Sequence, residues 1–344
     1  MNSKRILVLG DGGWGTALAL VLHHNGHNVT LWSKFPEYAQ YVNKKRENTK
    51  FLPGVKLPRT LKVISELIIQ NSDLIVMAVP TQFCRSVLKD LRSTLGVYTE
   101  RSECALRSTL PPIVSVAKGI EQTTLKRPSE IVKEVLDYPN DKIAVLSGPS
   151  HAEEVARQKP ASVVVASSNK KLARDLQAIF SNEYFRVYTQ DDVVGVETAA
   201  AVKNIIAIAA GICDGLGLGD NAKSALLTRG MVEISRLGQA LGGKKNTFFG
   251  LAGIGDLITT CISPHGRNRS VGVRIGKGET LTQILKSMQQ VAEGVWTTKA
   301  VMKVIKKYKV EMPITQEVYK ILFEDKDPMK AVYTLMTRKP KTEN

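Results

Sequence analysis

Residues 5–15 read R-I-L-V-L-G-D-G-G-W-G, a short aliphatic run followed at once by the pattern G-x-G-x-x-G. The aliphatic run predicts a buried strand, and the Ala- and Leu-rich residues that follow predict a helix. In this pattern Gly10 permits a tight turn, Gly12 lets the backbone approach a pyrophosphate, and Gly15 allows close packing of helix on strand. Residues 28–32 predict a second strand, which completes the βαβ unit typical of dinucleotide-binding domains.

The end of this second strand indicates which dinucleotide is bound. Strict NAD enzymes usually carry Asp or Glu there to bind the ribose hydroxyls. This chain has Trp32-Ser33-Lys34 instead. The ammonium of Lys34 can receive a ribose phosphate, so we expect Lys34 to contact the cofactor and NADP, with or without NAD, to be accepted. The alternative is that Lys34 is a solvated loop residue.

Further apolar runs predict that the sheet continues and is buried on both faces. They occupy residues 74–79, 113–117, 143–146, 163–167 and 185–188. Polar residues 95–112 are expected to form a surface loop. After residues 191–192 the pattern becomes helical, with helices expected at residues 194–213, 222–241, 281–288, 297–307, 315–323 and 328–337. The predicted fold is α/β: a Rossmann-like doubly wound sheet over residues 1–192, followed by an all-α substrate domain over residues 193–344.

Composition restricts the class of protein. The chain has 344 residues, 43% hydrophobic and 23% charged, which is ordinary for two globular domains. We expect no apolar run of the ~20 residues that span a bilayer, and no signal peptide. The four cysteines lack C-x-x-C spacing, which favours reduced thiols in the cytoplasm and no metal site. The net charge of +16 is spread along the chain and aromatic residues make up only 6%, which favours phosphorylated ligands over nucleic acid.

Residues 194–211 read V-G-V-E-T-A-A-A-V-K-N-I-I-A-I-A-A-G, a helix that is apolar all round except at Lys203 and Asn204. An unpaired buried ammonium is costly or loses its proton. Lys203 is therefore expected to be paired, to face a ligand, or to act as an acid or base near neutral pH. The structural alternative is an ion pair with Glu197 or another carboxylate.

Five other segments carry groups suited to anionic ligands. Lys118-Gly119 directly follows a predicted strand, at the sheet edge where ligands bind. Residues 147–152, S-G-P-S-H-A, offer backbone amides and a hydroxyl. Residues 253–256 place a carboxylate in a glycine-flanked turn, and residues 290–294 form a loop with one carboxylate. Residues 266–269, G-R-N-R, suit bidentate contact with phosphate. Each segment alone is more often structural.

Taken together, these blocks resemble the NAD(P)-dependent glycerol-3-phosphate dehydrogenase family, most closely its bacterial type. The resemblance rests on blocks in fixed order along nearly the whole chain: G-D-G-G-W-G-T-A-L-A, F-L-P-G, V-A-K-G-I-E, S-G-P-S-H-A, G-V-E-T-A-A-A-V-K-N-I-I-A-I-A-A-G, G-L-A-G-I-G-D-L, G-R-N-R, V-A-E-G and E-M-P-I-T. It implies hydride transfer between NAD(P)H and dihydroxyacetone phosphate, which yields sn-glycerol 3-phosphate for phospholipid synthesis. It also implies a homodimer, while the composition above leads us to expect a cytoplasmic protein without nucleic acid, metal or membrane insertion.

The resemblance also implies roles for single residues. Lys203 is similar to the family's general acid, with Lys118 and Asp256 as its catalytic neighbours. The implied substrate contacts are Lys118, Gly148, Ser150, Lys203, Asp256, Gly266, Arg267 and Asn268. The implied cofactor contacts are Gly10, Gly12, Gly13, Trp14, Gly15, Lys34, Lys118, Ala152, Arg267, Val291 and Glu293. Gly13 and Gly266 depart from the family pattern, because Ser is frequent at both positions.

Two other functions stay open at this point. A related β-hydroxyacid dehydrogenase shares the dinucleotide domain and a buried Lys-Asn pair, but such enzymes mostly grip carboxylates, whereas residues 266–269 favour a phosphate. The other is a non-catalytic nucleotide sensor, or a basic nucleic-acid binder that retains a Rossmann domain; a sensor is expected to lack the central lysine, and Lys203 is present.

Overall fold

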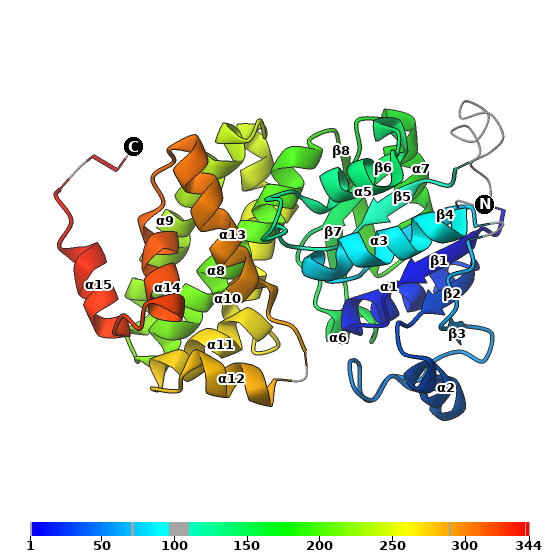
Figure 1. Ribbon diagram of the computed structural model, residues 1–344, viewed down its shortest axis with the longest axis horizontal. Helices are drawn as coiled ribbons and strands as arrows, with labels where there is room; N and C mark the ends of the chain where they lie inside the picture. Colours follow the sequence, from blue (N-terminus) through cyan, green and yellow to red (C-terminus); the bar gives the residue numbers. More distant parts are fainter. Residues whose placement is uncertain (1, 70–71, 96–109, 289, 341, 344) are drawn as a thin grey trace.

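A computed structural model describes residues 2–69, 72–95, 110–288, 290–340 and 342–343. It shows a layered α/β part that packs beside a block of helices (Figure 1). The strands are β1 (Arg5–Leu9), β2 (Asn28–Trp32), β3 (Lys62–Ile64), β4 (Leu74–Met77), β5 (Ile113–Ser115), β6 (Ile143–Ser147), β7 (Ala161–Ala166) and β8 (Phe185–Gln190). Most of the loop predicted at residues 95–112 lies outside the described residues.

The eight strands form one sheet in the order β3-β2-β1-β4-β5-β6-β7-β8. The first six follow the order 3-2-1-4-5-6 that is typical of dinucleotide-binding domains. All neighbours are parallel except β6 and β7, which pair antiparallel, and this reversal is not predicted by the sequence pattern. The carboxyl ends of β1, β2, β4 and β5 therefore lie along one edge, where such sheets bind ligands.

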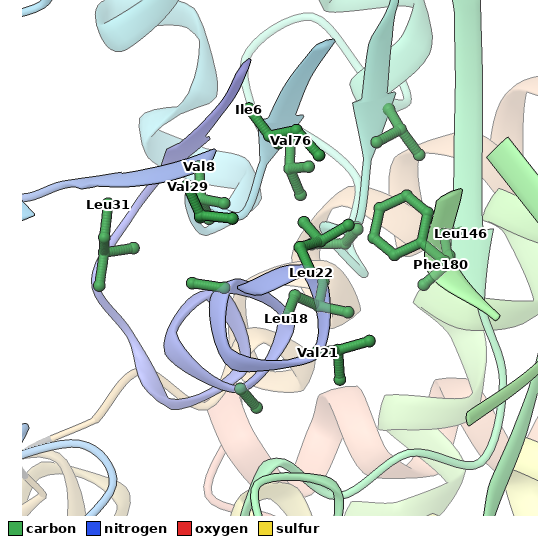
Figure 2. Close-up of a cluster of buried hydrophobic side chains, with 14 of the residues drawn as sticks. Ile6, Val8, Leu18, Val21, Leu22, Val29, Leu31, Val76, Leu146 and Phe180 are labelled. Atoms are coloured by element: carbon green, nitrogen blue, oxygen red, sulfur yellow. The ribbon is translucent and has the colours of Figure 1, made fainter. Parts of the chain in front are cut away.

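Helices cover both faces of the sheet. They are α1 (Gly13–His24), α2 (Pro36–Lys45), α3 (Thr81–Leu95), α5 (Pro128–Leu136), α6 (Ala152–Val155) and α7 (Lys170–Phe180). Ile6 and Val8 of β1 pack with Leu18 and Leu22 of α1 (Figure 2), whereas the alternate residues of β1 join a second core on the opposite face with α3 and α5. A strand buried on both faces explains why residues 5–9 are aliphatic without alternation.

The second half of the chain is a helical block built around α8. Its helices are α8 (Val193–Gly215), α9 (Gly219–Ala240), α10 (Asp256–Ile262), α11 (Arg267–Gly276), α12 (Leu281–Ser287), α13 (Glu293–Tyr308), α14 (Pro313–Phe323) and α15 (Pro328–Met336). We expected no apolar run long enough to cross a bilayer, and α8 shows that this expectation is wrong. The helix has 23 residues, and the mean hydropathy of its most apolar stretch of 18 residues is 1.6. Since 89% of that stretch is buried inside the protein, α8 serves as the core of this block.

Helices α8 and α11 pack backbone against backbone. An added Cβ at Gly211 would lie 2.0 Å from the carbonyl oxygen of Arg269, and one at Gly272 would lie 2.0 Å from that of Ile208. Neither glycine therefore tolerates a side chain without movement of a helix. Because α8 carries Lys203 and α11 begins with the G-R-N-R segment, this contact fixes the two motifs relative to each other.

Candidate active site

The glycine-rich turn connects β1 to α1 with almost no room for side chains. Gly10 has φ +109°, and a Cβ there would lie 2.9 Å from the carbonyl oxygen of Ala78. A Cβ at Gly15 would lie 2.0 Å from the carbonyl oxygen of Gly10. At Gly12, in contrast, no atom lies within 4 Å of an added Cβ. The fold itself requires Gly10 and Gly15, and the open space at Gly12 fits a pyrophosphate that approaches the backbone.

Helix α1 begins at Gly13, inside the glycine-rich pattern and before the Ala- and Leu-rich residues that predicted it, so its first amides belong to the turn. A Cβ at Gly13 would lie 2.7 Å from the carbonyl oxygen of Phe51 and 3.5 Å from the Cβ of Ala152. Serine at position 13, frequent in the family, would therefore crowd Phe51 in this chain. The same contacts bring together Gly13 and Ala152, two of the predicted cofactor positions.

Two donors at the starts of α1 and α3 are buried without a hydrogen-bond partner among the described residues. They are the indole Nε1 of Trp14 and the hydroxyl of Thr81, the first residue of α3. Buried polar groups are normally paired, so each is suited to an acceptor supplied by a ligand. The backbone amide of Thr81 donates to Glu293 Oε1 at 2.7 Å. Glu293, the first residue of α13 rather than part of a loop as expected, is thereby held at the same sheet edge.

The structure places Lys34 at the end of β2, as predicted, but gives it an exposed partner. Its Nζ lies 3.0 Å from Oδ2 of Asp90 on α3, with 59% and 47% of the two side chains exposed. Among the described residues, Lys34 has no hydrogen bond or ion pair with Lys118, Lys203 or Asp256. The predicted cofactor role of Lys34 therefore stays a prediction.

Lys203 lies at the centre of a buried polar cluster. Its Nζ donates to Asp256 Oδ1 at 2.8 Å and to Thr260 Oγ1 at 2.5 Å. Lys118 Nζ donates to the other oxygen of Asp256 at 2.9 Å and to the carbonyl oxygen of Gly148 at 3.1 Å. The side chains of Lys203 and Asp256 are only 5% and 2% exposed. One carboxylate thus holds both lysines, which come from segments far apart in the chain.

Glu197 is not the partner of Lys203, although the sequence left that ion pair open as an alternative to a catalytic role. Glu197 accepts instead from Arg127 at 2.8 Å and from the amide and hydroxyl of Ser129. Asp256 was expected in a turn, but a short π-helical turn over Leu251–Gly255 leads directly into α10, of which Asp256 is the first residue. Asp256 and Thr260, four residues apart, therefore share the face of α10 that meets Lys203.

Burial lowers the pKa of Lys203 to about 8; the charge of Asp256 opposes this shift and that of Lys118 adds to it. Burial alone would raise the pKa of the Asp256 carboxyl, but the two lysines together hold it below its ordinary value. An ammonium has three N–H donors, and two of those on Lys203 have partners among the described residues. The third is left for a substrate oxygen. An amine with a pKa near 8 can both give and take a proton at physiological pH.

The G-R-N-R segment forms the N-terminus of α11, close to this cluster. A Cβ at Gly266 would lie 2.9 Å from the carbonyl oxygen of Thr260, so a serine there would be crowded in this chain. Asn268 is buried and accepts from the amide of Gly294 at 3.0 Å. Arg267 is exposed and donates to the carbonyl oxygen of Val291 at 3.2 Å. The predicted phosphate-binding and late cofactor segments therefore meet.

Two predicted substrate positions and one unpredicted group complete the site. The hydroxyl of Ser150 donates to the Gly148 carbonyl, which also receives Lys118. His151 was not singled out from the sequence, yet its Nε2 is buried without a partner among the described residues. Its ring lies 6.0 Å from that of His265, next to the G-R-N-R segment, and burial lowers the pKa of His151. Its place in the S-G-P-S-H-A segment, which the sequence already identified as suited to an anionic ligand, could have indicated His151. No group of three or more potential metal ligands occurs in the described part of the chain.

Comparison with known proteins supports the resemblance found in the sequence. Residues 5–173 and 192–333 match the N-terminal and C-terminal models of NAD-dependent glycerol-3-phosphate dehydrogenase. The chain is 47% identical over 341 residues to glycerol-3-phosphate dehydrogenase (NAD(P)+) of Fusobacterium nucleatum, covering 98% of each chain. It is 50% identical over 343 residues to the Geobacillus kaustophilus enzyme of the same name, covering 99% of this chain and 96% of the relative.

Solved structures give the same result. Glycerol-3-phosphate dehydrogenase from Coxiella burnetii superposes with a TM-score of 0.90 at 37% identity, covering 98% of this chain and 99% of the other. D-mandelate dehydrogenase, at 15% identity and a TM-score of 0.60, shares the fold alone. The predicted fold class and the predicted oxidoreductase activity are confirmed, in preference to a hydroxyacid dehydrogenase or a nucleotide sensor. The chain belongs to the NAD-dependent glycerol-3-phosphate dehydrogenase family.

Proposed function

We propose that this chain interconverts dihydroxyacetone phosphate and sn-glycerol 3-phosphate with NAD(P), and that Lys203 is its proton donor and acceptor. The observation that carries the proposal is the buried ammonium of Lys203, held by Asp256 and Thr260, with one N–H that has no partner among the described residues. The names of the relatives supply the substrate class, since each is a glycerol-3-phosphate dehydrogenase.

Lys203 acts on the oxygen at the reacting carbon. When a ketone is reduced, negative charge grows on its oxygen, and an ammonium stabilises that charge and then donates its proton. In the reverse direction the neutral amine takes the proton of the hydroxyl. Asp256 orients Lys203 through Oδ1 while Oδ2 holds Lys118, whose charge favours the neutral amine. A bound nicotinamide supplies the hydride.

The phosphate end of the substrate is assigned to the N-terminus of α11. Backbone amides at a helix N-terminus and an Arg side chain suit a phosphate. Gly266 offers its amide, Arg267 its guanidinium and Asn268 its buried amide group. Gly148 and Ser150 are further substrate contacts in this proposal, because the Gly148 carbonyl oxygen accepts from both Lys118 and Ser150. The packing of α8 on α11 keeps the distance from Lys203 to the phosphate constant.

The cofactor is assigned to the carboxyl edge of the sheet. The open backbone at Gly12 and the unpartnered Nε1 of Trp14 support this assignment. The proposed cofactor contacts are Gly10, Gly12, Gly13, Trp14, Gly15, Lys34, Lys118, Ala152, Arg267, Val291 and Glu293. A division into a cofactor domain at residues 1–192 and a substrate domain at residues 193–344 agrees with β8 ending at Gln190 and α8 beginning at Val193.

The enzyme works as a homodimer in the cytoplasm, without nucleic acid and without insertion into a membrane. It needs no metal. It accepts NADP through Lys34 as well as NAD. Its product supplies the glycerol phosphate of phospholipids.

The test is oxidation of NADH and NADPH with three substrates: dihydroxyacetone phosphate, unphosphorylated dihydroxyacetone and a small β-keto acid. We expect kcat/KM for the phosphate ester to exceed that for dihydroxyacetone by roughly 100-fold or more, because at least two charge-assisted hydrogen bonds to phosphate are lost. Faster turnover of the keto acid would favour a β-hydroxyacid dehydrogenase. Salt-sensitive DNA binding without turnover of dihydroxyacetone phosphate would favour a nucleic-acid binder.

A further inference from the structure

Two carboxylates lie beside the end of β2 and have no part in the proposed reaction. Asp11 lies inside the glycine-rich turn and is only 9% exposed. Its Oδ2 accepts from the hydroxyl of Ser33 at 2.7 Å, and Ser33 is fully buried directly after β2. Asp90 lies on α3 and binds Lys34, the residue after Ser33. All four residues therefore surround the terminus of one strand.

This terminus has a known use in dinucleotide-binding domains. An Asp or Glu there accepts a hydrogen bond from the 2′-hydroxyl of the adenosine ribose. In this chain Ser33 takes that position, and its hydroxyl ties the carboxylate of Asp11 to it. A carboxylate is thus present at the end of β2, although it comes from the turn after β1. The sequence pattern alone hides it, because positions 11 and 33 are far apart in the chain.

The carboxylate of Asp11 is held in place, and among the described residues Ser33 is its one side-chain donor. The backbone oxygen of Asp11 accepts from Asn48 at 2.7 Å and from Thr16 at 3.3 Å, which fixes the residue in the turn. No side chain of the described residues donates to its Oδ1. Burial raises the pKa of the Asp11 carboxyl, while the hydrogen bond from Ser33, one from the backbone amide of Asp11 itself and the charge of Lys50 act in the opposite direction. Oδ1 is therefore suited to accept from a ribose hydroxyl.

The same place is unfavourable for a ribose phosphate in two ways. A 2′-phosphate would bring negative charge to the Asp11 carboxylate. It would also have to compete with Asp90 for Lys34, whose Nζ lies 3.0 Å from Oδ2 of Asp90. Both the repulsion by Asp11 and the competition with Asp90 weaken binding of the phosphorylated cofactor. The 2′-phosphate also removes the hydrogen bond that a 2′-hydroxyl could donate to Asp11.

We infer that Asp11, with Asp90 as its outer partner, is a specificity-determining residue that shifts the cofactor preference from NADP toward NAD. The inference rests on the proposed function, since it concerns the cofactor of that reaction. Lys34 has the opposite effect and favours NADP. The ratio of the affinities for NAD and NADP therefore depends on how the positive charge of Lys34 compares with the negative charges of Asp11 and Asp90.

The experiment measures dissociation constants of NADH and NADPH by calorimetry without substrate, and then kcat/KM for both with dihydroxyacetone phosphate. Asp11→Asn is expected to raise the dissociation constant of NADH relative to that of NADPH by roughly tenfold or more, which corresponds to the loss of one charge-assisted hydrogen bond. Asp90→Asn is expected to improve NADPH binding by a smaller factor and to leave NADH binding unchanged. Lys34→Ala is expected to weaken NADPH binding only.

The matched control is Asp73→Asn, which removes an exposed carboxylate paired with Arg5 at the opposite end of β1. It should leave the ratio unchanged. Asp11→Ala provides the same test without requiring a hydrogen bond from Ser33, and Asp90→Asn tests the inference if neither variant at position 11 folds. A ratio that stays at its wild-type value in Asp11→Asn or Asp11→Ala, or in Asp90→Asn where these do not fold, overturns the inference. Failure of the wild type to turn over dihydroxyacetone phosphate would instead overturn the proposed function.

Discussion

The glycine-rich turn and the lysine cluster are two functional regions built on opposite principles. The turn is one contiguous segment, residues 10–15, and close contacts such as that between Gly15 and Gly10 define its shape. The cluster joins Lys118, Lys203 and Asp256, and 138 residues separate the first from the last. The turn is fixed by the absence of side-chain atoms and the cluster by a balance of charges. Local patterns therefore identify the first region from sequence, whereas the second needs the fold.

The largest expected effect on stability comes from removing the negative charge of Asp256, which balances the two lysines of the cluster. Asp256→Asn leaves Lys118 and Lys203 without their shared carboxylate. Breaking a buried ion pair by loss of one partner costs about 3–5 kcal/mol of unfolding free energy near neutral pH. The cost should shrink as pH rises, because Lys203 then loses its proton. Urea unfolding of the wild type and the variant at several pH values measures this difference.

The control is Asp73→Asn, whose exposed partner is Arg5. Surface pairs contribute about 0–1 kcal/mol, so this variant should unfold almost as the wild type does. An equal loss of stability in both variants would show that Asp256 is not the central countercharge of the site.

This contrast also explains what the sequence predicts. The strand at residues 28–32 has the predicted bounds, and the burial of Lys203 follows from the apolar residues on every side of it. Spacing alone left the partner of Lys203 open between Glu197 and another carboxylate, and only the family resemblance pointed to Asp256, because Asp256 is brought close by the packing of α10 on α8. Strand β3 has three residues, too few to show a period, and the antiparallel pairing of β7 depends on chain connections rather than on composition.

The second prediction concerns the turn. Gly15→Ala places a Cβ 2.0 Å from the carbonyl oxygen of Gly10, so β1 and α1 must separate. Such overpacking typically costs about 1–3 kcal/mol, and the turn should lose its shape as well. We expect lower thermal stability together with loss of NADH binding. Wild-type affinity in a stable variant would contradict the geometry of the turn.

A smaller effect is expected at Thr260, which only supports the cluster. Thr260→Val removes its hydrogen bonds to Lys203 and Asp256, at a cost of about 1 kcal/mol. The KM for dihydroxyacetone phosphate should change little, while kcat should fall because Lys203 is less well oriented. Thr260→Ser retains the hydroxyl and should restore kcat. If serine fails to do so, the hydroxyl is not what orients Lys203.

The smallest effect on stability is expected at Gly12, where an added Cβ meets no atom within 4 Å. Gly12→Ala should change the unfolding free energy by no more than about 0.5 kcal/mol, as at an open surface position. Binding of NADH should nevertheless weaken, because the methyl group fills the space left for the pyrophosphate. Together with Gly15→Ala, this variant separates the glycine required by the fold from the glycine required by the ligand. Unchanged affinity would place the pyrophosphate elsewhere.

The central claim is that Lys203 transfers the proton, and the pH dependence of kcat in the wild type and in Lys203→Ala tests it most directly. Since the pKa of Lys203 lies at about 8, ketone reduction by the wild type should slow above that pH as the ammonium is lost. Lys203→Ala should lose roughly 10²–10⁴-fold in kcat and the pH step with it, while its dissociation constant for NADH stays unchanged. Near-normal turnover in the variant, or the same pH step without the lysine, would contradict the account.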